Sequence, residues 1–199
     1  MHKIVIVIPA AGASSRMRGR DKLLETVDGA PLLARQARMA AATGYDVLVT
    51  LPAGSAARRA VLDEIDGVCV EEVQDAAEGL AASLRRGAVW AGSRGADALM
   101  VVLADLPELE SEDLRSLARN AAIHPDRALR ATDSSGKPGH PVIFPARLFA
   151  ALERVTGDDG ARDVLRGEDV IALPLPDRRA TTDLDTPEAW AAWRARTGR

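Results

Sequence analysis

The chain is poor in cysteine and has no strong excess of charge. Cys69 is the only cysteine among 199 residues, so no disulfide can form within the chain and no cysteine cluster can bind a metal. Its apolar neighbours predict a buried core position rather than a nucleophile. The formal net charge is −3, which is not the basic excess that broad nucleic-acid binding or a polybasic membrane patch requires. We therefore expect neither a nucleic acid nor a membrane as a partner.

Long apolar segments are missing as well. No run approaches the roughly 20 residues of a membrane span. The apolar run near the N-terminus is broken by Pro9 and is followed by arginines rather than by a cleavage site. Two nucleotide-binding fingerprints are also missing, because neither G-x-x-x-x-G-K-[ST] nor G-x-G-x-x-G occurs. The sequence thus predicts a cytoplasmic protein in which any nucleotide is held by a different loop.

Apolar strand patterns alternate with helical patterns almost throughout the chain. We expect strands at residues 3–9, 46–51, 68–72, 98–103, 127–131, 142–144 and 170–173. We expect helices at residues 31–43, 55–65, 79–91, 111–122, 145–155, 161–165 and 187–196. The alternation predicts one α/β domain over residues 1–199, with a three-layer, Rossmann-like, mostly parallel sheet and helices on both faces. A turn-forming cluster at residues 133–139 predicts a hairpin that interrupts the alternation.

The loop after the first predicted strand carries the clearest functional signal. Residues 8–22 read Ile-Pro-Ala-Ala-Gly-Ala-Ser-Ser-Arg-Met-Arg-Gly-Arg-Asp-Lys. The small residues let the backbone approach a ligand closely, and the hydroxyls and cations suit the distributed charge of a triphosphate. The alternative is an ordinary strand-to-helix turn with a solvated basic face. We predict a nucleotide-binding loop that uses Ala10, Ala11, Gly12, Ser14, Ser15, Arg16 and Lys22.

Carboxylates mark two further segments. Asp105 ends an apolar strand and Pro107 turns the chain away, which leaves Asp105 at the edge of the sheet where ligands bind. Asp183 and Asp185 precede the C-terminal helix, for which Thr186 is the predicted N-cap. Mg²⁺ takes one or two carboxylates together with phosphate oxygens and water, so we predict Asp105 as one ligand and Asp185 as the second. Helix capping is the alternative for Asp105, and Asp183 remains an alternative second ligand.

Two more segments contain candidate residues. Gly79 begins a predicted helix that contains Ser83, and the free amides at its start can hold an anion or the polar edge of a base. His140 lies between Gly139 and Pro141, which fixes the position of its ring, and a structural role and a functional role are equally open for it. The sequence thus adds Gly79, Ser83 and His140 to the candidate site.

Taken in this order, the segments resemble the molybdenum cofactor cytidylyltransferase family, within the nucleotidyltransferases of the nucleotide-diphospho-sugar transferase fold. The matching motifs are Ala10-Ala11-Gly12-x-Ser14-Ser15-Arg16-Met17 with Lys22, Glu78-Gly79-x-x-x-Ser83, Asp105-x-Pro107, Gly136-x-Pro138-Gly139-His140-Pro141, Gly157-Asp158-x-Gly160-Ala161-Arg162 and Asp183-x-Asp185-Thr186-Pro187. They span nearly the whole chain, and the Pro-Gly-His-Pro element is specific to the cofactor-modifying branch. Ala104 and residues 18–21 depart from the family pattern, which leaves the acceptor open.

The resemblance implies transfer of CMP from CTP to the terminal phosphate of molybdopterin or molybdenum cofactor, with release of pyrophosphate. Ala11 favours CTP, because the guanylyl-transferring relatives usually carry glycine at this position. A molybdoenzyme or its chaperone would be a further partner. The resemblance assigns these roles: residues 10–12 and Arg16 line the triphosphate, Lys22 neutralises charge, Ser83 lies near the base, Asp105 and Asp185 hold Mg²⁺, and His140 faces the acceptor.

Three alternatives share this fold or its nucleotide-binding half. A nucleotidyltransferase could act on another acceptor, such as a sugar phosphate or an alcohol phosphate, and would differ only around residues 136–162. A non-catalytic relative could hold nucleotide or molybdopterin as a chaperone, although the intact cations and carboxylates argue against degeneration. A glycosyltransferase of similar fold would need an Asp-x-Asp motif after the central strand, and Asp105-Leu106-Pro107 lacks the second aspartate.

Overall fold

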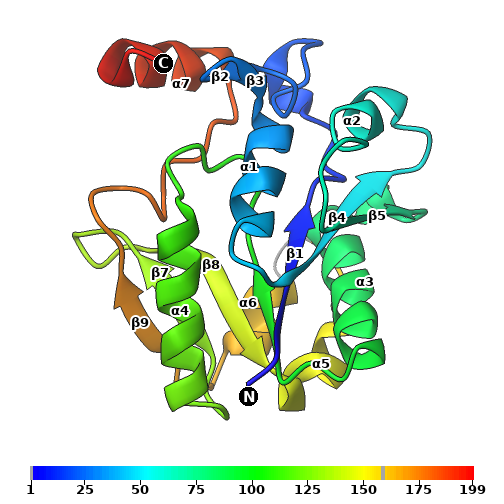
Figure 1. Ribbon diagram of the computed structural model, residues 1–199, viewed down its shortest axis with the longest axis vertical. Helices are drawn as coiled ribbons and strands as arrows, with labels where there is room; N and C mark the ends of the chain where they lie inside the picture. Colours follow the sequence, from blue (N-terminus) through cyan, green and yellow to red (C-terminus); the bar gives the residue numbers. More distant parts are fainter. Residues whose placement is uncertain (1, 158–159) are drawn as a thin grey trace.

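The computed structural model describes residues 2–157 and 160–199, and these residues form a mixed sheet of seven strands (Figure 1). Strand β8 runs antiparallel to both of its neighbours, and the other neighbouring strands are parallel to one another. The predicted hairpin is confirmed, because the turn-forming cluster joins β7 to β8. The order across the sheet is β5 (Val68–Val73), β4 (Asp46–Pro52), β1 (Ile4–Pro9), β6 (Ala98–Val101), β8 (Pro138–Pro145), β7 (Leu129–Thr132) and β9 (Ile171–Pro174).

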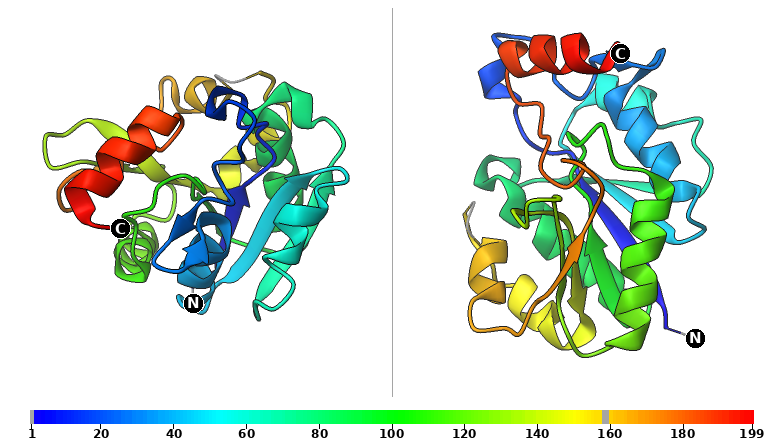
Figure 2. Two further views of the ribbon diagram at one scale, coloured as in Figure 1. Left: turned by 90° about the horizontal axis from the view of Figure 1, so that it is seen from above. Right: turned by 90° about the vertical axis from the view of Figure 1, so that its left-hand side faces the viewer.

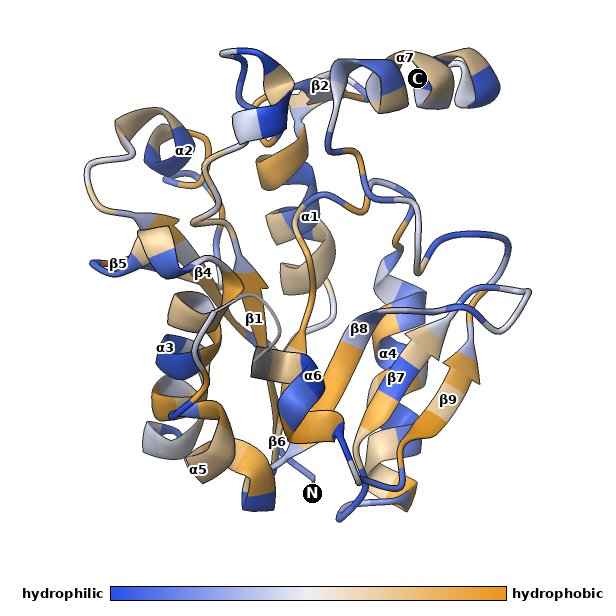
Figure 3. Ribbon diagram, turned by 180° about the vertical axis from the view of Figure 1, so that it is seen from behind, coloured by the Kyte–Doolittle hydropathy of each residue, from blue (hydrophilic) through white to orange (hydrophobic). Residues whose placement is uncertain are grey.

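Helices cover both faces of the sheet (Figures 1 and 2). The first face carries α1 (Leu32–Ala41) and α4 (Ser111–Ile123), and the second carries α3 (Leu80–Ser93), α5 (Phe149–Leu152) and α6 (Gly160–Leu165). Successive residues of a strand point to opposite faces, so a sheet covered on both sides needs strands that are apolar throughout. The hydrophobic colour along the strands in Figure 3 reflects this requirement. The α/β fold with helices on both faces is confirmed.

The C-terminal helix α7 (Pro187–Thr197) lies away from the sheet, over a short hairpin of β2 (Thr26–Val27) and β3 (Ala30–Pro31) (Figure 1). Thr186 caps this helix by accepting a hydrogen bond of 3.1 Å from the amide of Ala189, as predicted. An apolar cluster joins the helix to the N-terminal loop, and it consists of Met17, Val27, Leu32, Leu184, Trp190 and Trp193. The helix therefore packs directly against the loop that the sequence marks as nucleotide-binding.

Several details differ from the prediction. The β2–β3 hairpin was not predicted, although Asp28 and Gly29 form its turn with φ angles of 51° and 80°. Helix α2 (Ala56–Ala60) is shorter than the predicted helix at 55–65, and α5 follows a 3₁₀ turn, η3 (Ala146–Leu148). Two further 3₁₀ turns, η1 (Ser15–Met17) and η2 (Ala76–Glu78), precede β2 and α3.

The position of Cys69 is a correction. Its side chain is exposed rather than buried in the core. The reason is that β5 is an edge strand, with β4 as its only neighbour in the sheet.

Within the part of the chain that the structure describes, no helix is long and apolar enough to cross a membrane.

Candidate active site

A cavity of about 570 Å³ opens beyond the carboxyl ends of β1 and β6. Eleven of the residues to which the sequence assigns a candidate role line it: Ala10, Ala11, Gly12, Arg16, Lys22, Gly79, Ser83, Asp105, His140, Asp183 and Asp185. Ser14 and Ser15 differ from the prediction, since neither lines the cavity. The Ser14 hydroxyl instead donates a 3.2 Å hydrogen bond to Asp21, and Ser15 is exposed at the start of η1.

Lys22 bridges the two predicted metal ligands. Its Nζ lies 2.5 Å from Oδ2 of Asp105 and 2.6 Å from Oδ1 of Asp185. Arg16 pairs with the other oxygen of Asp185, at 2.7 Å from Nη2 to Oδ2. Residues that are 83 and 163 positions from Lys22 in the sequence therefore share its ammonium. The fold brings the predicted phosphate cations and the predicted metal carboxylates into one cluster.

Lys22, Asp105 and Asp185 are largely withdrawn from solvent, whereas the Arg16 side chain is mostly exposed, and burial affects the ionisation of Lys22 and Asp185. Burial lowers the pKa of Lys22, but the two carboxylates outweigh burial and hold it above the ordinary value. Burial raises the pKa of Asp185, but Lys22 and Arg16 outweigh it and hold the net pKa below the ordinary value. The pKa of Asp183 is raised, first by burial and then by the charges of Asp105 and Asp185. Asp185 is thus the more readily ionised of the two neighbouring carboxylates.

Contacts from distant elements fix Asp105. From α1, Gln36 Nε2 donates a 3.0 Å hydrogen bond to the carbonyl of Leu106, and Arg35 Nη1 donates one of 2.6 Å to the carbonyl of Pro107. The amide of Leu184 donates to the carbonyl of Asp105 itself, at 3.2 Å. The chain after β6 is therefore held on both sides, and the Asp105 side chain keeps its position at the cavity.

The residues present fit a divalent cation that binds together with a phosphate ligand. Oδ1 of Asp105 is buried and has no hydrogen-bond partner in the described part of the chain, a costly arrangement for a carboxylate oxygen. Across residues 2–157 and 160–199, no group of three or more His, Cys, Asp or Glu side chains is arranged to hold a metal by itself. Two carboxylates nevertheless suffice for Mg²⁺ when phosphate oxygens and water complete its coordination.

His140 faces the cavity as a neutral ring. Its Nδ1 is buried without a hydrogen-bond partner among the described residues. Burial and then the positive charge of Arg130 lower its pKa from 6.5 to about 4. The preceding Gly139 lies so close to Ala180 that an added Cβ would stand 1.9 Å from the Ala180 carbonyl oxygen. Only glycine fits there, and this close approach holds the imidazole at the wall of the cavity.

Gly79 and Ser83 lie at the start of α3 and also line the cavity. Gly79 has a φ of +69° and is the N-cap of α3. No side-chain hydrogen bond caps this helix start. The Ser83 side chain is almost fully buried, and its hydroxyl accepts a 2.9 Å hydrogen bond from the Thr50 hydroxyl. Ser83 can therefore contact a ligand only at the floor of the cavity.

Part of the cavity lining was not predicted from the sequence. Arg130 and Lys137 received no role, and Arg162 was named only within a motif, yet all three line the cavity beside β7, β8 and α6. Burial and the charge of Arg162 lower the pKa of Arg130. Asp158 of the same motif lies outside the described residues. A single arginine between Leu129 and Ala131, within an apolar strand, was the available signal for Arg130.

Comparison with known protein families identifies the kind of protein to which this site belongs. The sequence profile of the MobA-like NTP transferase domain matches residues 6–173, which is most of the chain. The chain belongs to this family. It is therefore a nucleotidyltransferase that uses an NTP, and the prediction is confirmed at this level.

Curated relatives carry two kinds of name. The chain is 32% identical over 120 residues to the purine catabolism protein PucB of Bacillus subtilis (strain 168), a match that spans 59% of this chain and 57% of that protein. It is 28% identical over 187 residues to a probable molybdenum cofactor guanylyltransferase of Synechococcus elongatus (strain ATCC 33912 / PCC 7942 / FACHB-805), with 92% of this chain and 94% of that protein covered. Family membership thus establishes the reaction class, whereas the names of these relatives do not establish which nucleotide this chain uses.

Solved structures share the fold. Rv0371c from Mycobacterium tuberculosis H37Rv matches with a TM-score of 0.79 at 28% identity, covering 96% of this chain and 97% of that chain. A second structure of Rv0371c, in complex with manganese, matches with a TM-score of 0.73 at 26% identity and the same two coverages. A structure described as a nucleotidyl transferase (Mth528) matches with a TM-score of 0.81 at 19% identity, covering 98% of both chains. The expected nucleotide-diphospho-sugar transferase fold is confirmed.

Proposed function

We propose that the chain transfers CMP from CTP to the terminal phosphate of molybdopterin or molybdenum cofactor and releases pyrophosphate. The observation that carries this proposal is the cluster in which Lys22 bridges Asp105 and Asp185 beside a loop of small residues. Nucleotidyl transfer needs charge neutralisation and positioning more than a covalent nucleophile. The cluster offers both, because two cations and two carboxylates converge on one wall of the cavity.

The residues of the nucleotide half have distinct roles in this proposal. Arg16 and Lys22 receive the triphosphate, whose negative charge grows on the departing pyrophosphate as the bond to the α-phosphorus breaks. Small side chains at residues 10–12 leave backbone amides accessible to phosphate oxygens. Asp105 and Asp185 would hold a divalent cation, for which we propose Mg²⁺, and this cation would neutralise phosphate charge. A structure of the similar protein Rv0371c is described as a complex with manganese, which supports the proposal of a divalent metal.

We place the acceptor in the part of the cavity that is away from the proposed nucleotide-binding loop. Arg130, Lys137 and Arg162 form a cationic lining that suits an acceptor whose attacking group is a phosphate monoester. An oxygen of that phosphate attacks the α-phosphorus, so a phosphoanhydride forms while pyrophosphate leaves. The neutral His140 ring offers the acceptor one hydrogen bond without adding charge.

The preference for CTP rests on Ala11. Its side chain is buried and packs with Val73 and Ala82, next to the Ser83 wall of the cavity. The methyl group fills space that a glycine would leave open, and a pyrimidine needs less room than a purine. The Synechococcus relative is named a guanylyltransferase, so GTP is the competitor against which CTP must be tested.

The names of the relatives also support the biological setting that we propose. The molybdenum cofactor names of these relatives support a molybdenum cofactor acceptor. We propose in addition a cytoplasmic location and delivery of the product to a molybdoenzyme or its chaperone.

Pyrophosphate release tests the proposal directly. The full chain is incubated with each of the four NTPs, with Mg²⁺ or Mn²⁺, and with molybdopterin, molybdenum cofactor, a sugar phosphate or an alcohol phosphate. We expect the highest kcat/KM with CTP and a molybdopterin-type acceptor, and no turnover in EDTA. A higher kcat/KM with GTP would refute the nucleotide choice, and turnover of a sugar phosphate alone would refute the acceptor.

A further inference from the structure

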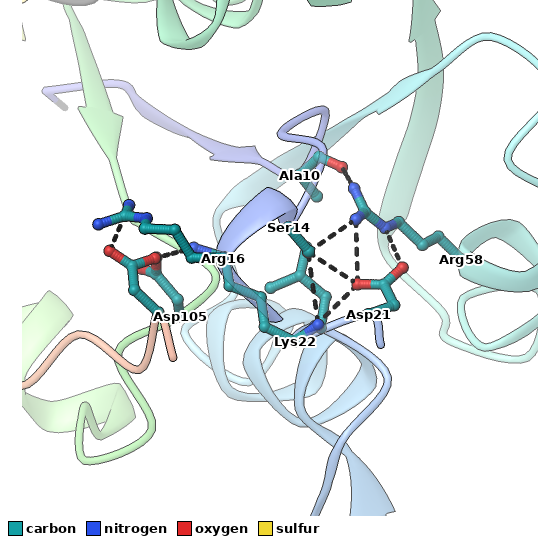
Figure 4. Close-up of polar contacts among 9 residues, drawn as sticks. Ala10, Ser14, Arg16, Asp21, Lys22, Arg58 and Asp105 are labelled. Carbon is teal, nitrogen blue, oxygen red and sulfur yellow. Dashed lines mark hydrogen bonds and ion pairs between the residues drawn. The ribbon is translucent and has the colours of Figure 1, made fainter. Parts of the chain in front are cut away.

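Arg58 lies outside the cavity and forms hydrogen bonds with the loop of residues 10–22, the proposed nucleotide-binding loop. Arg58 lies on α2, its side chain is only 5% exposed, and it does not line the cavity. Its guanidinium donates hydrogen bonds to the carbonyl of Ala10 at 2.6 Å, to the Ser14 hydroxyl at 3.2 Å, and to both carboxylate oxygens of Asp21 at 2.7 and 3.0 Å (Figure 4). One side chain thus contacts the loop at three separate positions.

These three positions cover the loop from beginning to end. Ala10 follows β1, Ser14 has a left-handed φ of 50°, and Asp21 immediately precedes Lys22. Asp21 also accepts hydrogen bonds from the Ser14 hydroxyl at 3.2 Å and from the amide of Leu23 at 3.0 Å. The loop is therefore closed around the guanidinium, and the backbone on both sides of Lys22 is tied to it.

The chemistry of this contact requires arginine. A guanidinium is a planar fork with five donors, which can bind a carboxylate with two hydrogen bonds while other donors reach a carbonyl and a hydroxyl. A lysine ammonium has the same charge but not the same reach or geometry. A buried ion pair is weak evidence for stability, because desolvation offsets much of its attraction, and its best-attested use is to specify one geometry.

We propose that Arg58 is a positioning residue, which fixes the loop of residues 10–22 through Ala10, Ser14 and Asp21 and so holds Lys22 at the phosphate site. The inference rests on the proposed role of this loop in nucleotide binding. Arg58 touches neither the cavity nor the reacting groups, so it acts only through the loop. Its neighbour Arg59 is 42% exposed and only approaches Glu72, at 3.6 Å, which makes it a matched control on the same helix.

Four variants separate positioning from stability. Arg58→Lys keeps the charge, Arg58→Met removes it, and Arg58→Met with Asp21→Leu removes both partners of the buried pair. Arg59→Met is the control. Each full-length variant is assayed for kcat and KM with CTP and GTP, for thermal unfolding, and for the initial rate of tryptic cleavage after the loop residues Arg16, Arg18 and Arg20 without nucleotide.

We expect kcat/KM to fall by about 10²-fold in Arg58→Lys and in Arg58→Met, because a displacement of about 1 Å at a catalytic group costs this much. Tryptic cleavage in the loop should accelerate about tenfold in both, since local opening controls proteolysis. The double variant should recover the melting temperature, because no buried charge is left unpaired, but it should recover neither kcat/KM nor resistance to trypsin. Arg59→Met should behave like the wild type in all three assays.

Two results would overturn the proposal: wild-type kcat/KM and loop cleavage in Arg58→Lys, or recovery of activity together with melting temperature in the double variant. Failure of the proposed function has a different signature. In that case the wild type itself would release no pyrophosphate with any NTP, while the tryptic assay would still report whether Arg58 fixes the loop.

Discussion

Replacing Lys22 with methionine removes the ammonium between Asp105 and Asp185 and keeps most of the side-chain volume. The Nζ atom lies 2.5 and 2.6 Å from the two carboxylates, and the three side chains are 16%, 14% and 17% exposed. Removing one partner of a buried ion pair costs about 3–5 kcal/mol, because the remaining charge is left uncompensated. Partial exposure screens these charges, so we expect a loss of about 3 kcal/mol in the free energy of unfolding when EDTA is present.

A divalent cation should reverse most of this loss, because the two carboxylates that repel each other in Lys22→Met are the ligands that it prefers. A ligand that binds only the folded state stabilises it by about 2.7 kcal/mol at a concentration 100 times its dissociation constant. Turnover should nevertheless remain about 10²- to 10³-fold below the wild type, since the lysine donor to the phosphates is still missing.

Urea unfolding with EDTA and with excess MgCl₂ measures both effects. Lys137→Met is the control, because Lys137 is an exposed cation of the same cavity. Two results would refute the reasoning: equal stability of Lys22→Met and wild type in EDTA, or equal stabilisation of both proteins by Mg²⁺. The first would mean that the bridge contributes nothing to stability, and the second that the cation binds elsewhere.

Three further predictions concern other parts of the site. Asp105→Asn and Asp185→Asn should each abolish metal-dependent turnover. The double variant should be little worse than either single variant, because ligands of one ion act as a unit. Independent, multiplicative losses in kcat would contradict a shared metal. The pKa of His140 is lowered from 6.5 to about 4, so the unfolded chain takes up the proton first as pH falls. The free energy of unfolding should then decrease between about pH 6.5 and about pH 4 by at most about 3 kcal/mol, and His140→Gln should flatten this slope in urea titrations at several pH values. Gly139→Ala should lower the free energy of unfolding by about 3 kcal/mol or more, because its Cβ would stand 1.9 Å from the Ala180 carbonyl oxygen. A melting temperature equal to that of the wild type would disprove this close contact.

The sequence predicted the features of the site that depend on local pattern. An apolar strand followed by Asp105 and Pro107 gives the position of the carboxylate at the sheet edge whatever its neighbours are. Thr186 and Pro187 likewise define the start of α7, because capping depends on adjacent residues. These features need no knowledge of the order of the strands.

Features that depend on tertiary position were missed. Arg58 and Arg59 are adjacent residues of the same type on one helix, and only packing against the loop buries the first and exposes the second. Cys69 lies in an apolar strand, yet the order of the strands places that strand at the edge. Ser14 has the composition of a phosphate-binding residue, but its hydroxyl is taken up by Asp21 and Arg58. Local sequence contains no information on any of these three outcomes.

The contact between α7 and the N-terminal loop has a consequence during synthesis. Met17 is fully buried against Trp190 and Trp193, and Asp185 completes the pair of carboxylates at Lys22. A ribosome that has released residues 1–174 has exposed every strand of the sheet, but neither Asp185 nor the helix that covers Met17. The nascent chain therefore passes through a stage in which the sheet can form while the loop lacks its packing partner. The pair of carboxylates at Lys22 is therefore completed only after every strand of the sheet has been synthesised.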